Sequence, residues 1–383
     1  MRYCAAFVLL LPLVAPTALA GPHGLQESLE VLRRVGPHNR GSREAAAAWK
    51  TVAAADAGQL PTLLAAMDGA SPLARNWVRS ALDEVLDRAR AGRQPLPAKE
   101  LETFVLDRRH DPQARRLAYE LLTETDARTP DRLLPGMLDD PSPELRRDAV
   151  ARVLDRAGRL QKDGKNADAI GLYLQAFDAA RSQTQLEQAA KGLTELGRMV
   201  NITEHLGMVR DWKVIGPFPC PAGAGLDHVY PPEQKIDLDA AYEGKGDKVR
   251  WKDYATRDRY GLVDLNKAIG DAPASVGYAL AEFTADRARD VELRVGCYNA
   301  FELWVNGELV LDRRDAFTGM SLDHYTGKAH LRAGKNLILM KVCREDPPPP
   351  VPRLWQFQLR VCDDSGAAVH PASRKDGGKP TPE

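Results

Sequence analysis

The feature that most constrains this chain is a change in the spacing of its apolar residues near position 211. From about residue 25 up to that point, apolar residues recur every three to four positions, which is the period of a helix that buries one face. Beyond it, apolar and polar residues alternate in short runs that Pro, Gly and aromatic residues separate, as in antiparallel strands. The sequence therefore predicts a helical region followed by a β region.

The helical region repeats a helix that begins with proline. The stretches SPLARNWVRSAL, DPQARRLAYELL and SPELRRDAVARVL align on Pro72, Pro112 and Pro143. Proline suits the first turn of a helix because an N–H there would have no helical partner. Another helical stretch precedes each copy, so the unit is a pair of helices, and pairs of this size bury their apolar stripes by stacking. The alignment also brings three arginines into one column: Arg75, Arg115 and Arg146.

This unit resembles the HEAT repeat, in which Asp is followed by Arg six positions later and by a small residue three positions further on. Asp140, Arg146 and Ala149 fit that pattern. The resemblance implies an α-solenoid over residues 25–157 with an extended groove for a protein partner. The arginine column is then a candidate contact for acidic groups of the partner, and pairing between repeats is the alternative use of the same side chains.

A different helical pattern fills residues 158–210. GKNADAIGLYLQAFDAA followed by QTQLEQAAKGLTELG resembles one tetratricopeptide-type hairpin, with Gly171 and Ala176 where a close approach of two helices needs small residues. We expect this hairpin to cap the solenoid.

The β region is predicted to be an antiparallel sandwich over residues 211–365, because short connections between strands exclude a parallel sheet. Strands are expected at 276–284, 290–297, 300–305, 308–312, 336–344 and 354–362. Asn306-Gly307 predicts a two-residue hairpin turn that pairs Val305 with Glu308 and Trp304 with Leu309. Residues 366–383 have little to bury and are expected to be disordered.

Both faces of this hairpin are apolar. With a two-residue loop, one face carries Trp304, Leu309 and Leu311, and the other carries Phe301, Leu303, Val305 and Val310. A sheet does not leave two such faces in water. One face should therefore line the sandwich interior, and the other should lie under a loop, the solenoid or a ligand.

The sequence around the hairpin, GCYNAF before it and HLRAGKNLILMKV after it, resembles the galactose-binding-like β-sandwich family, a jelly-roll fold that includes many carbohydrate-binding modules. The resemblance implies this fold first, with a sandwich that would hold a glycan or dock on another module, and structural calcium is left open. Trp304 is the candidate stacking platform, although core packing is the more common place for an aromatic at strand spacing. Four residues in predicted loops are candidates for a binding edge: Tyr298, Asn299, Asp323 and Tyr325.

The start of the chain, MRYCAAFVLLLPLVAPTALA, has the layout of a secretory signal peptide over residues 1–20, with cleavage before Gly21. No later segment is apolar over the length that a bilayer requires. We expect a periplasmic or secreted protein without a transmembrane segment. The whole chain also resembles the exported HEAT-repeat proteins of planctomycete-type bacteria, in which a WK.IGPF sandwich follows a solenoid.

An exported protein meets an oxidising compartment, so the cysteines that follow the leader are candidates for disulfides. Strand phase places Cys297 and Cys362 on opposite faces of the sheet, which disfavours a bond between them. Buried free thiols are the alternative. The candidates are Cys220, Cys297, Cys343 and Cys362.

Charge and motifs narrow the function. Lys plus Arg and Asp plus Glu number 53 each, which argues against a nucleic-acid partner. The sequence holds no G-x-S-x-G, H-E-x-x-H or Walker motif, so we predict no catalytic and no metal site. The leading interpretation is a non-enzymatic binding or scaffold protein with a protein partner, a glycan, or both. One alternative is a purely structural envelope component. The other is a carbohydrate-active enzyme or its subunit with acids in residues 217–273: Asp227, Glu233, Asp237 and Asp239.

Overall fold

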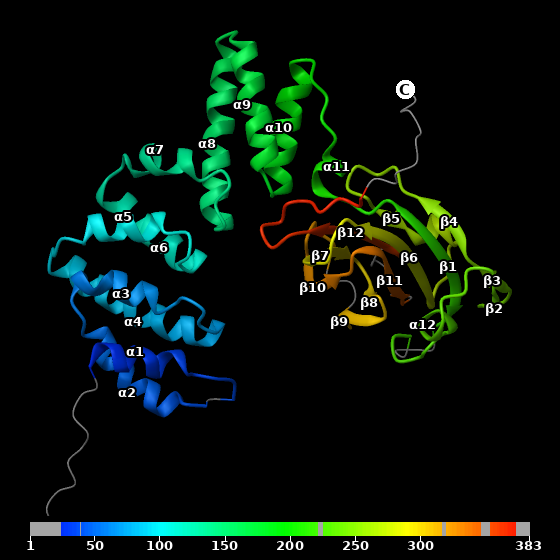
Figure 1. Ribbon diagram of the computed structural model, residues 1–383, viewed down its shortest axis with the longest axis horizontal. Helices are drawn as coiled ribbons and strands as arrows, with labels where there is room; N and C mark the ends of the chain where they lie inside the picture. Colours follow the sequence, from blue (N-terminus) through cyan, green and yellow to red (C-terminus); the bar gives the residue numbers. More distant parts are fainter. Residues whose placement is uncertain (1–23, 39, 221–224, 316–318, 346–352, 373–383) are drawn as a thin grey trace, which may run out of the picture. The chain divides into compact units, whose positions relative to one another are not determined.

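The computed structural model describes residues 24–38, 40–220, 225–315, 319–345 and 353–372 (Figure 1). It divides into two compact units, and the boundary between Leu145 and Arg146 falls in the first turn of helix α8 (Pro143–Lys162). Apart from two four-residue helices, the helices precede residue 207 and antiparallel sheets follow from residue 211, so the predicted order of α and then β is confirmed. The predicted signal peptide lies outside the described residues.

The first unit is helical. Its elements are α1 (Leu25–Arg33), α2 (Ser42–Ala53), α3 (Leu60–Ala65), α4 (Pro72–Ala91), α5 (Ala98–Leu106), α6 (Pro112–Thr125) and α7 (Thr129–Leu133), with 3-10 turns at Ala57–Gln59 and Leu134–Gly136. Helix α1 packs on α2, and α5 packs on α6. Throughout the described chain, no helix combines the length and the apolar character that crossing a membrane requires.

The proline-led helices begin where the sequence predicts. Pro72, Pro112 and Pro143 each occupy the first turn, in α4, α6 and α8. A side-chain oxygen caps the first two: Ser71 accepts a hydrogen bond from the N–H of the third residue into α4, and Asp111 accepts two from the first turn of α6. These caps satisfy donors that the helix leaves without partners, and each stabilises a helix by about 1 kcal/mol.

The second unit begins with the rest of α8 and continues with α9 (Asn166–Ala179), α10 (Gln183–Glu195) and α11 (Ile202–Leu206). Ala176 is buried, as expected. Gly171 is not at a close approach, since a Cβ there would meet nothing within 4 Å. The glycine that allows the contact is Gly192, where a Cβ would lie 2.4 Å from Cζ of Tyr173. The ring of Tyr173 in α9 therefore packs directly on the backbone of α10.

The β region contains two large antiparallel sheets, which are drawn in green to brown in Figure 1. The six-stranded sheet has the order β4 (Lys252–Ala255), β1 (Asp211–Pro219), β6 (Ser275–Ala285), β11 (Gly334–Arg344), β8 (Ala300–Val305), β9 (Glu308–Arg313). The four-stranded sheet has the order β10 (Tyr325–Leu331), β7 (Arg289–Cys297), β12 (Gln356–Cys362), β5 (Val263–Asp264). A small pair, β2 (Ala241–Glu243) and β3 (Lys248–Arg250), and two four-residue helices, α12 (Pro231–Gln234) and α13 (Leu265–Ala268), lie in the connections.

The six predicted strands correspond to β6, β7, β8, β9, β11 and β12. Strands β1, β4, β5 and β10 were not among the predicted ranges, although Tyr325, Ala329 and Leu331 of β10 alternate with polar residues. One apolar cluster is enclosed between the two sheets. Leu293 and Val295 enter it from the four-stranded sheet, and Leu303, Ile338 and Met340 enter it from the six-stranded sheet.

The hairpin of β8 and β9 has the predicted turn but a different register beyond it. Val305 lies opposite Glu308 and Trp304 opposite Leu309, as expected. A β-bulge then shifts the pairing, so Leu303 faces Leu311. Because the bulge inserts one extra residue into β9, Leu311 joins the interior cluster, whereas Leu309 stays 49% exposed. The expected grouping of Leu311 with Trp304 is therefore wrong.

The end of the described chain is ordered. Val369 is buried, and its N–H donates to the carbonyl oxygen of Val361 at 2.9 Å. The N–H of Ala372 donates to the carbonyl oxygen of Thr284 at 2.7 Å. The predicted disordered tail, residues 366–383, is therefore wrong for 366–372, which attach to the sheets through backbone hydrogen bonds and one buried valine. Residues 373–383 lie outside the described residues.

Candidate functional site on the outer face of the six-stranded sheet

The outer face of the six-stranded sheet carries a second apolar cluster. Alternate residues of β6 and β11, including Tyr278, Leu280 and Leu339, point away from the sandwich interior. The connection between β1 and β4 covers them with Leu226, Tyr230 and other side chains. The expectation that one apolar face of the hairpin lies under another segment is met only in part, because Trp304 packs partly against this cluster whereas Leu309 is 49% exposed.

A buried lysine anchors residues 225–236 of this connection, which we call the covering segment. Lys341 of β11 is fully buried, and its Nζ donates to the carbonyl oxygens of Leu226 at 2.8 Å and His228 at 2.9 Å. The same nitrogen lies 2.9 Å from Glu233 Oε1 and 3.3 Å from Glu302 Oε2. A buried ammonium is tolerated only when its donors and its charge are compensated. Here, two carbonyls and two carboxylates provide that compensation.

Two tyrosines complete this lysine cluster. The Tyr278 hydroxyl donates to Glu233 Oε1, the atom that also accepts from the Tyr230 backbone N–H at 3.2 Å. The pKa of Tyr278 is raised far above its usual range, mainly by burial and secondly by the hydrogen bond to Glu233. This hydroxyl therefore stays protonated and remains a donor. Burial also raises the pKa of Tyr230 to about 12. The hydroxyl of Tyr278, the N–H of Tyr230 and the ammonium of Lys341 therefore all meet at Glu233 Oε1.

Glu302 differs from Glu233. Burial raises the pKa of Glu302, and the charge and hydrogen bond of Lys341 oppose the rise. Its side chain is only 10% exposed, and that of Glu233 only 13%. A glycosidase needs two carboxyls that face each other across a space open to substrate. These two instead both pair with Lys341, Glu302 from strand β8 and Glu233 from the covering segment itself.

Next to the lysine cluster, the outer face opens into a groove of about 350 Å³. Trp304, Leu337 and Leu339 form its floor, and the residues of α12 with the two that follow form one wall. Trp304 is partly exposed and packs against the outer-face cluster with the rest of its ring. It therefore lies outside the sandwich interior that the sequence favoured.

The groove combines an apolar floor with polar groups at its rim. Gln234 and Lys235 are exposed, and Glu233 is partly exposed. Asn306 is used internally: its Nδ2 donates to Asn336 Oδ1 at 2.8 Å, and its Oδ1 accepts from the Leu337 N–H at 3.0 Å. These bonds fix the hairpin turn against β11, so the groove has a rigid end.

The four predicted loop residues do not join Trp304. Asn299 is 2% exposed, and it donates to the Leu354 carbonyl at 3.0 Å and accepts from the Gln356 N–H at 3.3 Å. Tyr298 precedes it and is bound to the same segment through its backbone N–H. Both residues hold the bend between β7 and β8 against the start of β12.

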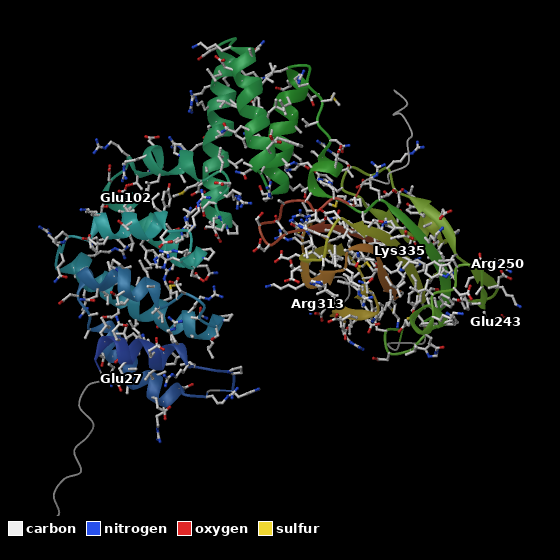
Figure 2. All side chains as sticks on the ribbon, viewed as in Figure 1. Glu27, Glu102, Glu243, Arg250, Arg313 and Lys335 are labelled. Carbon is white, nitrogen blue, oxygen red and sulfur yellow. The ribbon has the colours of Figure 1, made fainter. Side chains whose placement is uncertain are left out.

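Asp323 and Tyr325 lie at the start of β10. Asp323 pairs with Arg360 through bonds of 2.7 and 2.5 Å and with Arg294 at 3.2 Å. Burial opposes the charge of Asp323, but the two arginines outweigh it and lower its pKa. Tyr325 contacts the interior residue Phe301 edge-on and lies under Arg313, which is labelled in Figure 2. Since Phe301 faces the interior and Trp304 faces outward, these residues form no common site.

The arginine column is divided between two environments. Arg115 is 1% exposed, and its guanidinium makes two bonds of 2.7 Å to Asp140, which is equally buried. Arg115 is therefore unable to contact a partner, which corrects that expectation and favours pairing within the helical region. Arg75 is partly exposed beside Asp111 at 3.3 Å, and Arg146 is 6% exposed and donates to the Ser365 carbonyl at 2.9 Å.

The acids proposed for an enzyme are held separately. Asp227 pairs with Arg314, and Glu233 belongs to the lysine cluster. Asp237 lies 3.7 Å from Lys235 and accepts from the N–H of Asp239, which is exposed. Among the described residues, no three His, Cys, Asp or Glu side chains are grouped so as to hold a metal ion.

The cysteines follow the predicted strand phase. Cys297 lies in the sandwich interior with Val295, whereas Cys362 follows the outward positions of β12. Burial raises the pKa of Cys297 to about 12 and that of Cys362 to about 11. Cys220 and Cys343 meet on the outer face of the six-stranded sheet, where their sulfurs are 3.0 Å apart.

Sequence reasoning missed the lysine cluster, although a signal for it is present. Lys341 stands within LILMKVC and Glu302 within FELWV, and each is a charge in the middle of an otherwise apolar strand. Two such charges on neighbouring strands indicate a buried ion pair.

No protein-family model and no curated protein sequence matches the chain. Among solved structures, β-glucosidase from Kluyveromyces marxianus in complex with glucose matches at 14% identity and a TM-score of 0.25, over 39% of this chain and 16% of the glucosidase. A family 35 carbohydrate binding module from Clostridium thermocellum matches at 19% identity and a TM-score of 0.16, over 22% of this chain and 69% of the module. The β-glucuronidase of Faecalibacterium prausnitzii matches at 12% identity and a TM-score of 0.25, over 40% of this chain and 31% of that one. At these scores the likenesses define no family.

Proposed function

We propose that the protein is a non-enzymatic binding protein that holds a carbohydrate in the groove over Trp304. The observation that carries this proposal is a partly exposed indole on the floor of a groove with polar side chains at its rim. A sugar ring presents an apolar C–H face that stacks on an aromatic ring, and its hydroxyls bond to groups at the edge. Gln234 and Lys235 are placed at that edge.

The finer assignments belong to the same proposal. The two facing sheets would be a galactose-binding-like jelly roll, and the first unit a HEAT-type solenoid that ends in a tetratricopeptide-like hairpin and contacts a protein partner. Arg75 is the column residue best placed for such a contact, because it is partly exposed and lines a groove of about 260 Å³ with Arg79 and Arg116. Export to the periplasm or the medium would bring the groove to its glycan.

The test is binding of the full chain to a panel of soluble oligosaccharides, followed by tryptophan fluorescence and calorimetry. For any sugar that binds, Trp304→Ala should weaken affinity by at least about tenfold, and Trp304→Phe should weaken it less. Trp49→Ala is the matched control, since Trp49 is a partly exposed indole in the helical region. Affinity that is unchanged in a folded Trp304→Ala variant, or no binding across the panel, would refute the proposal.

The same mixtures test the absence of catalysis. After long incubation, each oligosaccharide should be recovered intact, because Glu233 and Glu302 are both committed to Lys341. Hydrolysis that Glu233→Gln abolishes would favour the alternative of a carbohydrate-active enzyme. Export is tested separately by N-terminal sequencing of the mature protein, which should begin at Gly21.

A further inference from the structure

The sulfurs of Cys220 and Cys343 lie 3.0 Å apart although the residues are 123 positions apart in the sequence. Cys220 follows β1 directly, and its N–H donates to the Ala274 carbonyl at 3.1 Å beside the first residue of β6. Cys343 lies in β11 opposite Val276 of the same strand β6. Backbone pairing on both sides of β6 therefore holds the two side chains together.

We propose that Cys220 and Cys343 form a disulfide in the oxidised protein, and that this bond fastens the covering segment to the six-stranded sheet. A disulfide sulfur pair is separated by about 2.05 Å, so the two sulfurs need to approach by about 1 Å, which side-chain rotation supplies. The bond would stand two residues from Lys341 on the same face of β11. A covalent and an ionic anchor would then hold the same segment.

The backbone around Gly225 lies close to both sulfurs. A Cβ at Gly225 would lie 2.3 Å from Sγ of Cys220 and 2.4 Å from Sγ of Cys343. The backbone of the covering segment therefore passes directly over both sulfurs, and a side chain there would displace them. Cys297 and Cys362 are excluded as partners, since one faces the sandwich interior and the other lies on β12 of the opposite sheet.

The two thiols also differ in pKa and in exposure, and these differences determine which one reacts first. The hydrogen bond between them lowers the pKa of Cys220 and raises the pKa of Cys343. Cys220 is the more exposed of the two, at 9% against 3%. Thiolates are the attacking species in thiol–disulfide exchange, so Cys220 reacts first.

The oxidant is another disulfide, either of a thiol oxidoreductase or of oxidised glutathione. The Cys220 thiolate attacks one sulfur of that disulfide, forms a mixed disulfide and releases one thiolate. Cys343 then loses its proton and attacks Sγ of Cys220, which forms the internal bond and expels the second thiolate. Two cysteines are oxidised by two electrons, and the oxidant is reduced to two thiols after protonation.

The test is disulfide mapping of the full chain after equilibration with an excess of oxidised over reduced glutathione. Remaining thiols are alkylated in denaturant, and the peptides are identified by mass spectrometry without reduction. We expect one cross-linked pair that joins Cys220 to Cys343, with Cys297 and Cys362 alkylated. Recovery of Cys220 and Cys343 as alkylated thiols, a lasting glutathione adduct on Cys220, or any other pairing would overturn the proposal.

A stability measurement gives a second readout. Oxidation should raise the Tm of the wild-type chain by about 5 °C or more, because the bond closes a long loop. Cys343→Ser should abolish the rise, and Cys362→Ser should preserve both the cross-link and the rise. The mapping uses the wild-type chain, so it remains decisive even if Cys343→Ser fails to fold. The inference is independent of the proposed sugar binding, since neither cysteine lines the groove.

Discussion

The helical unit and the β region each bury a cation, and they use it for different purposes. Arg115 is held by Asp140, which is 25 residues away and lies just before α8. Lys341 instead holds the carbonyls of Leu226 and His228, which are more than 100 residues away. The first pair fixes neighbouring helices, whereas the second fixes a long irregular connection to a sheet.

The comparison shows that the two regions differ in which groups a buried charge has to hold. Stacked helices satisfy their own backbone groups, so one planar guanidinium with a matching carboxylate is enough to set their register. An irregular segment on a sheet leaves carbonyls that no regular structure satisfies. A lysine has three donors on a flexible stem, and it serves several acceptors from one point.

The largest expected effect is that of Lys341→Met. The variant leaves Glu233 and Glu302 buried without their cation, which should lower the free energy of unfolding by about 4 kcal/mol. The measurement is urea unfolding followed by circular dichroism. A triple variant that adds Glu233→Gln and Glu302→Gln should recover a large part of the loss. A cost below about 1 kcal/mol for Lys341→Met would show that Lys341 does not anchor the covering segment.

The matching variant in the helical unit is Arg115→Met, with an expected loss of about 3 kcal/mol. The loss is smaller because Asp140 keeps the Ser142 N–H at 2.8 Å and Arg108 at 3.9 Å as partners. The same urea experiment measures it, and Asp140→Leu in the Arg115→Met background should restore part of the stability. An Arg115→Met variant less stable than Lys341→Met would reverse the comparison.

Asp323→Asn tests a buried pair whose carboxylate is partly exposed, and the expected loss is about 2 kcal/mol at neutral pH. Because the folded protein lowers the pKa of Asp323, its contribution is complete above the usual aspartate pKa of about 4 and is lost as pH falls through the folded value. The difference in unfolding free energy between wild type and variant should therefore be constant from pH 5 to 8 and shrink below about pH 4. A difference in unfolding free energy that grows on acidification would contradict a lowered pKa of Asp323 in the folded protein.

The smallest effect is expected for Arg90→Ala. Arg90 and Glu124 form a pair at 2.9 Å, but their side chains are 52% and 54% exposed. Solvent screens such pairs, so the change in unfolding free energy should stay below about 0.5 kcal/mol. A loss comparable to that of Arg115→Met would mean that solvent exposure does not explain why the Arg90–Glu124 pair contributes less than the buried Arg115–Asp140 pair.

Much of the fold was predictable because local patterns determine it. The change of period at residue 211, the proline-led helices and the Asn306-Gly307 turn each depend on a few neighbouring residues. The bulge was missed because a turn sequence sets the pairing next to the turn but not where the register shifts beyond it, and β10 was missed because it pairs with β7 about 30 residues earlier in the chain. Only Trp304 among the predicted ligand-binding residues reached the groove, because the rest of its lining comes from a connection whose course the sequence pattern does not specify.

The path of the covering segment also bears on the order in which the β region forms. Residues 226–233 dock on β8 and β11, which are synthesised and paired much later in the chain. Contacts of such long sequence separation form slowly, so we expect the segment to attach after the strands of the six-stranded sheet have paired. The amide hydrogens of α12 should consequently exchange with solvent much sooner than those of β6 and β11, and the groove is completed by the last part of the domain to fold.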